Sequence, residues 1–106
     1  MSDATAVILL TTIGATADVA PLARALVEER LAACVSVLPA MESFFRWEGA
    51  VQKDDERQLV IKTSPARLEE LQARLRTLHP YELPEMLVLS ARGGDDYLAW
   101  IHESTA

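Results

Sequence analysis

Residues 41–63, MESFFRWEGAVQKDDERQLVIKT, contain two extended segments joined by a two-residue turn. Aromatic and β-branched residues favour strands, and we predict strands over Met41–Trp47 and Val51–Thr63. Glu48-Gly49 predicts a tight hairpin turn between them, because glycine readily adopts the positive φ that such turns need. A doubly wound sheet requires strictly alternating strands and helices, so a central hairpin argues against that architecture.

Short apolar runs on either side of the hairpin predict the remaining strand segments. They cover Ala6–Thr12, Cys34–Leu38 and Glu85–Ser90. Pro39 interrupts the run that continues from Cys34 into the hairpin, so we expect a bend or a sheet edge there.

Helical spacing of apolar residues predicts two helices between the strands and a third after the last strand. The apolar positions of the first helix are Val19, Leu22, Ala23, Leu26, Val27 and Leu31, and those of the second are Leu68, Leu71, Leu75 and Leu78. We expect Thr16 or Asp18 to cap the first helix, with Pro21 in its first turn. The second helix is predicted to begin at Ser64-Pro65 and to end at His79-Pro80. Asp95-Asp96 are predicted to begin the C-terminal helix.

The resulting order, β-α-β-β-α-β followed by a helix, predicts an α+β ferredoxin-like sandwich. Right-handed crossovers place both internal helices on one face of the sheet. We expect a single domain over residues 1–106.

The hairpin is long for a chain of this size. An arm of about 13 residues spans ~43 Å, whereas a globule of this length is roughly 34 Å across. The arm therefore either overhangs the core and associates with another copy, or folds back on its own sheet at Pro39. Phe44, Phe45 and Trp47 lie near the tip and favour self-association, in which they serve as interface anchors.

Composition excludes several classes of protein. The 106 residues include 16 acidic and 10 basic side chains, a formal charge of −6, which argues against a nucleic-acid-binding protein. A single cysteine, Cys34, excludes an internal disulfide, and no run of apolar residues is long enough for a membrane helix. Met1–Thr5 lack the basic start of a signal peptide, so we expect a cytoplasmic protein.

Several short segments combine into a recognisable pattern. They are Leu31–Val35, Trp47–Gly49, Ile61–Thr63, His79–Glu85 and Tyr97–Trp100. Together they resemble the CutA family of divalent-cation tolerance proteins, and the stretch His-Pro-Tyr-x-x-Pro-Glu is the most specific part. The resemblance covers nearly the whole chain. It implies a non-enzymatic, ferredoxin-like subunit in a homotrimer whose architecture is similar to PII signalling proteins, with a role in divalent-metal tolerance and copper binding.

The resemblance also implies a cleft between subunits that gathers the family's shared polar residues. In this chain they are Cys34, Glu56, Lys62, His79, Tyr81 and Glu85. His79, Cys34 and Glu85 are the candidate ligands of a divalent metal, either copper or zinc, because thiolate, imidazole and carboxylate groups suit these ions. Lys62, Tyr81 and Glu56 are the candidate ligand-binding residues of the cleft. Some relatives carry a cysteine and a second histidine where this chain has Thr11 or Thr12 and Leu78.

Each candidate also has a structural interpretation. Cys34 fits a small buried side chain, and His79 fits a cap at the end of a helix. Lys62 fits a solvated or ion-paired lysine, while Tyr81 and Glu85 fit a pair that pins their loop. The acidic run Asp54–Glu56 fits either a solvated strand face or oxygen ligands for a hard cation.

Two functions follow from these observations. The first is a metal-responsive, non-enzymatic trimer that binds divalent ions. The second is a signalling or scaffolding trimer, similar to PII, that takes a small anionic ligand or a partner protein with the help of Lys62. Scattered serine, histidine and aspartate residues do not define a catalytic triad, so a hydrolase ranks last.

Overall fold

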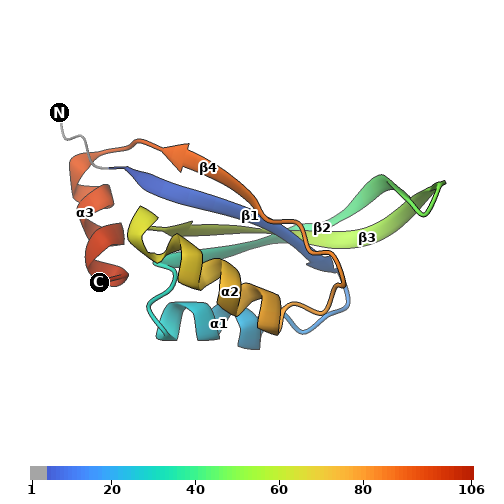
Figure 1. Ribbon diagram of the computed structural model, residues 1–106, viewed down its shortest axis with the longest axis horizontal. Helices are drawn as coiled ribbons and strands as arrows, with labels where there is room; N and C mark the ends of the chain where they lie inside the picture. The colour runs from blue at the N-terminus through green and yellow to red at the C-terminus, as the bar shows by residue number, and fades with distance from the viewer. Residues whose placement is uncertain (1–4) are drawn as a thin grey trace.

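The chain forms one antiparallel sheet with three α-helices, in a computed structural model that describes residues 5–106 (Figure 1). In order, the elements are β1 (Ala6–Gly14), α1 (Ala20–Glu28), β2 (Cys34–Trp47), β3 (Ala50–Thr63), a 3₁₀ turn (Pro65–Arg67), α2 (Leu68–Leu78), β4 (Leu87–Ala91) and α3 (Asp95–Ser104). The expectation about a signal peptide concerns the N-terminus, and its first four residues lie outside the described range. No helix within residues 5–106 is both long and apolar enough to cross a membrane.

The strand order is β2-β3-β1-β4, and every neighbouring pair is antiparallel. β1 lies inside the sheet, because it pairs with β3 on one side and with β4 on the other. Among residues 5–106, both outer strands, β2 and β4, leave one edge without a neighbouring strand. This arrangement confirms the ferredoxin-like α+β fold that the element order predicts.

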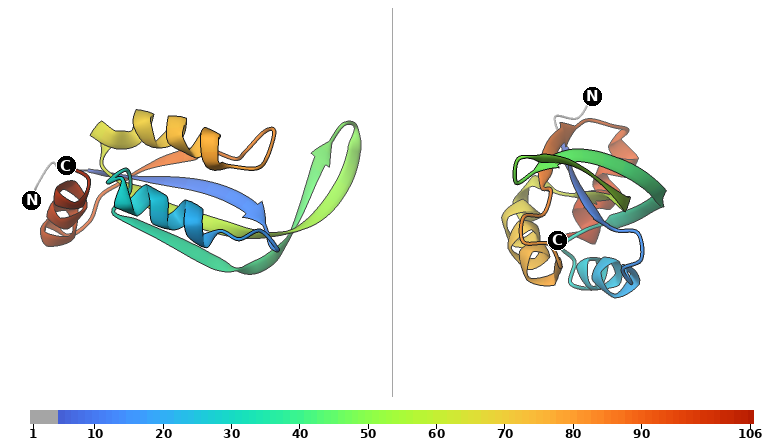
Figure 2. Two further views of the ribbon diagram at one scale, coloured as in Figure 1. Left: turned by 90° about the horizontal axis from the view of Figure 1, so that it is seen from below. Right: turned by 90° about the vertical axis from the view of Figure 1, so that its right-hand side faces the viewer.

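Helices α1 and α2 lie side by side across one face of the sheet (Figure 2). Alternate strand residues point toward them, and with the apolar faces of the helices they form the main core of Leu9, Ile13, Val19, Leu22, Leu26, Leu31, Ala32, Leu59, Ile61, Leu71 and Leu75. α3 lies at one end of the sheet, where Leu98 and Ile101 pack with Ala6 and Ala33. No described helix covers the other face of the sheet, which carries the exposed Leu87 and Leu89.

Beyond the sheet, β2 and β3 continue as a two-stranded arm, residues 40–55, that pairs with no other strand of the described chain. A register shift between Val37 and Ala40 confirms the irregularity predicted at Pro39. The turn is Glu48-Gly49, as predicted, and both residues have positive φ (51° and 80°). The arm extends past the helices, and the molecule measures 47 × 26 × 23 Å, so the arm does not fold back on its own sheet (Figure 2).

The ends of some elements differ from the predictions. Neither Thr16 nor Asp18 caps α1, because the N-cap is Val19 and makes no side-chain cap bond, with Pro21 in the first turn. Ser64-Pro65 begins a 3₁₀ turn, and α2 follows from Leu68. β4 begins at Leu87, where its pairing with β1 begins.

Candidate functional site

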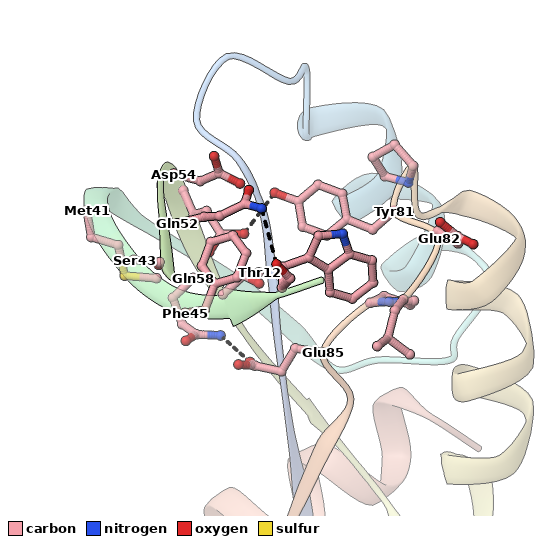
Figure 3. Close-up of a pocket in the computed structure, with 15 residues that line it drawn as sticks. Thr12, Met41, Ser43, Phe45, Gln52, Asp54, Gln58, Tyr81, Glu82 and Glu85 are labelled. Atoms are coloured by element: carbon pink, nitrogen blue, oxygen red, sulfur yellow. Dashed lines mark hydrogen bonds between the residues drawn. The ribbon is translucent and has the colours of Figure 1, made fainter. Parts of the chain in front are cut away.

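A cleft of about 900 Å³ lies between the arm and the loop that follows α2 (Figure 3). The hairpin contributes alternate residues to it, namely Met41, Ser43, Phe45 and Trp47 from β2 and Gln52, Asp54, Glu56 and Gln58 from β3. Side chains alternate between the two faces of a strand, so these eight share the face that looks toward the loop. The loop residues 80–85 form the opposite wall, and Thr12 of β1 completes the lining.

Glu56 and Tyr81 connect the two walls of the cleft. The Tyr81 hydroxyl donates a hydrogen bond of 2.8 Å to Oε2 of Glu56, whose side chain is largely buried. Burial, followed by the bond to Glu56, raises the pKa of the Tyr81 hydroxyl above its ordinary value. The phenol therefore keeps its proton and holds the carboxylate at the base of the arm.

Glu85 is held by a different residue of β3. Nε2 of Gln58 donates to Glu85 Oε2 at 3.0 Å and to the Thr11 carbonyl oxygen at 2.6 Å. The predicted Tyr81–Glu85 pair is therefore wrong. β3 presents Glu56 and Gln58 on the same face, and each bonds a different residue of the loop.

His79 uses both ring nitrogens inside the protein. Nε2 donates to the Thr12 carbonyl oxygen at 2.7 Å, and Nδ1 accepts the Tyr81 backbone N–H at 3.0 Å. The imidazole also packs edge-on against the Tyr81 ring, and the residue is 7% exposed. His79 is the C-cap of α2. A metal could bind its imidazole only if one of these two hydrogen bonds were broken.

Cys34 and Lys62 lie at the other end of the sheet, opposite each other on β2 and β3. The Lys62 ammonium donates to the Tyr97 hydroxyl at 3.1 Å, a bond that is the main cause of a raised pKa for Lys62. The Cys34 thiol lies 3.7 Å from the Ser36 hydroxyl. Lys62 is six residues from Glu56 along the extended β3, a separation of ~20 Å.

The predicted site residues thus fall into two groups. Glu56, Tyr81, Glu85 and His79 lie by the arm, whereas Cys34 and Lys62 lie near α3. Within residues 5–106, no three His, Cys, Asp or Glu side chains are placed to hold a metal ion. Cys34, His79 and Glu85 therefore do not form a metal centre inside one chain.

The aromatic residues of the arm also divide between two environments. Phe45 and Trp47 line the cleft. Phe44 is 71% exposed and, because side chains alternate, lies on the opposite face of the arm. Within one chain the Phe44 side chain is therefore open to solvent, as expected for a residue that anchors a neighbouring molecule.

Sequence reasoning missed Gln58 and Tyr97, which bond Glu85 and Lys62. For Gln58 a signal was present. Counting outward from the Glu48-Gly49 turn in steps of two residues places Gln58 on the same face as Glu56. For Tyr97 no signal was present, because only the packing of α3 on the end of the sheet brings it near β3.

A family model described as CutA1 divalent ion tolerance protein matches residues 7–104. The chain belongs to the CutA1 family. A divalent-cation tolerance protein CutA from Thermus thermophilus is 46% identical over 85 residues, which covers 79% of this chain and 82% of the relative. One from Pectobacterium atrosepticum is 43% identical over 100 residues, covering 93% and 91%. The solved CutA structure from Synechococcus elongatus superposes with a TM-score of 0.91 at 38% identity, covering 100% of this chain and 95% of the other.

Membership of the CutA1 family confirms the resemblance drawn from the sequence motifs. It relates the chain to tolerance of divalent ions, and the family is named for this property rather than for a reaction. The solved CutA1 structures share the fold over nearly the whole chain, including one from Thermus thermophilus with a TM-score of 0.88.

Proposed function

We propose that this CutA1 family member is a non-enzymatic homotrimer that binds divalent metal ions between its subunits. The observation that carries the proposal is the division of the candidate residues between two ends of the sheet. One chain cannot bring Cys34 to Glu85, but a second copy can place its own Cys34 end beside the arm of the first. The candidate residues then complete one another across an interface, as in the PII-like arrangement that the sequence motifs imply.

Exposed apolar surface supports self-association. Phe44 and Val51 are exposed on the arm, and Leu87 and Leu89 are exposed on the open face of the sheet. β2 and β4 are edge strands with unpaired backbone groups. Such surface on a soluble protein marks contacts with other molecules, and identical copies usually close into symmetric assemblies.

The donor types support a metal of the copper or zinc class. Cys34 supplies a thiol, and Glu85 supplies a carboxylate from the opposite group. His79 joins them only if its bond to Thr12 or to Tyr81 is released. A free thiol as ligand also agrees with the cytoplasm, where cysteines stay reduced.

Light scattering and metal titration test this proposal. We expect the mass of three chains at micromolar concentration, and saturable binding of Cu²⁺ or Zn²⁺ by calorimetry. Cys34→Ser and Glu85→Gln should each weaken binding by about tenfold or more, which is about 1.4 kcal/mol. Glu28→Gln is the matched control for the loss of one carboxylate, since Glu28 is exposed on α1 and forms its ion pair with Arg24. A monomer, or unchanged affinity in both variants, contradicts the proposal, and unchanged affinity in His79→Ala removes His79 from the site.

A second candidate function rests on Lys62. Its ammonium lies beside the Tyr97–Trp100 ring pair, whose centroids are 5.4 Å apart, so a cation and aromatic surface are exposed together. This arrangement favours an anionic organic ligand, as in the PII-like signalling or scaffolding function. Thermal-shift measurements with nucleotides and organic acids test it, because a ligand that binds the folded state raises the melting temperature. The shift should be lost in Lys62→Ala.

A further inference from the structure

Cys34 and Lys62 approach any neighbouring molecule together, because they lie directly opposite each other on β2 and β3. Opposed residues of an antiparallel pair point to the same face of the sheet, with their Cβ atoms about 4.5–5.5 Å apart. Leu59 and Ile61 are buried beneath the helices, so Lys62 and Cys34 point to the other face. A second copy therefore cannot present its Cys34 thiol to a ligand without presenting the Lys62 ammonium as well.

The charge of Lys62 is not balanced within its own chain. The ammonium donates to the Tyr97 hydroxyl at 3.1 Å and lies 5.4 Å from the centroid of the Tyr97 ring, and both of these partners are uncharged. Lys62 forms no ion pair within residues 5–106. By contrast Lys53, the other lysine of the chain, pairs with Glu42 and Asp55 at 3.5 and 3.0 Å. The Lys62 ammonium is thus available to a carboxylate of another molecule.

The cleft at the opposite end of β3 carries the complementary charge. Its lining includes four carboxylates, those of Asp54, Glu56, Glu82 and Glu85 (Figure 3). No lysine, arginine or histidine of residues 5–106 lines it, and the donors that hold Glu56 and Glu85 are the neutral side chains of Tyr81 and Gln58. Positive charge at one end and negative charge at the other suit copies that meet head to tail.

The inference rests on the proposed homotrimer, in which the Cys34 end of one copy lies beside the arm of the next. The position that brings Cys34 to Glu85 also brings an ammonium into a cleft of carboxylates. We propose that Lys62 of one copy competes with the divalent metal ion for the Glu85 carboxylate of the next copy. In the metal-free assembly the ammonium is the counter-ion of the cleft.

Metal binding then requires the ammonium to leave the cleft. A divalent ion and an ammonium beside the same carboxylate repel each other, so the ammonium returns to Tyr97 of its own chain. The contact between Lys62 and Tyr97 is therefore its position in the metal-bound assembly. Because each metal ion must displace an internal cation, Lys62 lowers the affinity of the site and restricts binding to high metal concentrations.

Substitutions of Lys62 and Tyr97 test the competition by calorimetry with Zn²⁺ on the assembled protein, at one pH. Lys62→Met keeps a long side chain without the charge, so it should bind Zn²⁺ about tenfold more tightly than the native chain. Lys62→Arg keeps the charge and should bind no more tightly than the native chain. Tyr97→Phe removes the hydroxyl to which the ammonium returns, and it should bind about threefold more weakly. Lys53→Met is the matched control for net charge and should stay within about twofold.

Nuclear magnetic resonance of isotope-labelled lysine observes the side chain directly. The chain has two lysines, so Lys53→Met assigns both signals. Zn²⁺ is a closed-shell ion and does not broaden them. In the metal-free trimer the Lys62 ε-methylene should lack the upfield shift of a group above an aromatic ring. Zn²⁺ should produce that shift as the ammonium returns over Tyr97, and the Lys53 signal should not move.

The outcomes separate this inference from the assembly on which it rests. A monomer, or no saturable Zn²⁺ binding by either the native chain or Lys62→Met, removes the proposed metal-binding trimer and the inference with it. A trimer that binds Zn²⁺ equally tightly in the native chain and in Lys62→Met overturns the inference alone. A Lys62 signal that Zn²⁺ leaves unchanged does the same, as does a gain in Lys53→Met equal to that in Lys62→Met.

Discussion

Strands β2 and β3 pass through two different environments. Within the sheet, Leu59 and Ile61 of β3 are completely buried beneath the helices, whereas on the arm Phe44 of β2 is 71% exposed. The antiparallel pairing of the two strands runs through both regions with one irregularity at Val37/Ala40. Backbone pairing therefore accounts for the shape of the hairpin, but only the sheet region has side-chain burial to stabilise it. An isolated two-stranded ribbon is marginal in water, and the proposed trimer would supply the contacts that the arm lacks within one chain.

The largest expected effect comes from truncating the buried part of β3. Leu59→Ala should lower the free energy of unfolding by about 2–5 kcal/mol, because it leaves a cavity among residues that cannot fully collapse. Urea denaturation followed by circular dichroism measures this loss, which should appear at every protein concentration.

Phe44→Ala is the matched substitution on the arm. It removes a large apolar side chain that has little cover within the chain, so it should weaken association and leave the packing of the core intact. Its effect should therefore be seen in the protein concentration at which the proposed trimer dissociates. A concentration-independent loss as large as that of Leu59→Ala would show that Phe44 is buried within its own subunit.

The sheet and the arm could be predicted because their signals are local. Glu48-Gly49 fixes the turn, and once the turn is fixed, pairing on both sides follows by counting residues. The cap of α1 was mispredicted, since Thr16 and Asp18 are good capping residues but the helix begins at Val19-Ala20-Pro21. There the missing N–H of proline removes part of the need for a side-chain cap.

The arrangement of the candidate site could not be predicted to the same extent. The sequence motifs place His79 close to Tyr81, but they do not show that its two nitrogens bond the Thr12 carbonyl and the Tyr81 N–H. Cys34 and His79 are far apart because they lie at opposite ends of the sheet. The strand register places Cys34 beside Lys62 at one end, and α2 ends with His79 at the other. Such distances depend on long-range pairing, which residue type alone does not encode.

Thr11 of β1 is a polar residue buried within the sheet region. Its side chain is completely buried, and its hydroxyl has no hydrogen-bond partner among the described residues. Valine has nearly the same shape without the polar atom, so Thr11→Val should raise the free energy of unfolding by about 1 kcal/mol. Thermal or urea denaturation measures the change.

Thr63→Val is the control for that substitution. Thr63 is equally buried, but its hydroxyl donates to the Leu31 carbonyl oxygen at 2.8 Å, so the same chemical change should destabilise the protein. If Thr11→Val were destabilising as well, the Thr11 hydroxyl would have a partner, for example an ordered water.

The smallest expected effect concerns the hydrogen bond between Tyr81 and Glu56, which ties the base of the arm to the body. The pKa of Tyr81 is raised in the folded protein above its ordinary value of 10.0, so below that pH both the folded and the unfolded chain carry the proton. As the pH rises above 10.0, the unfolded chain releases it first, and stability is lost. The loss should be modest, because Tyr81 keeps part of its surface in contact with water. Urea midpoints in a pH series across this value should fall more steeply for the native chain than for Tyr81→Phe. Equal slopes in the native chain and Tyr81→Phe would mean that the hydrogen bond between Tyr81 and Glu56 does not contribute to stability. The base of the arm would then be held against the rest of the subunit by other contacts.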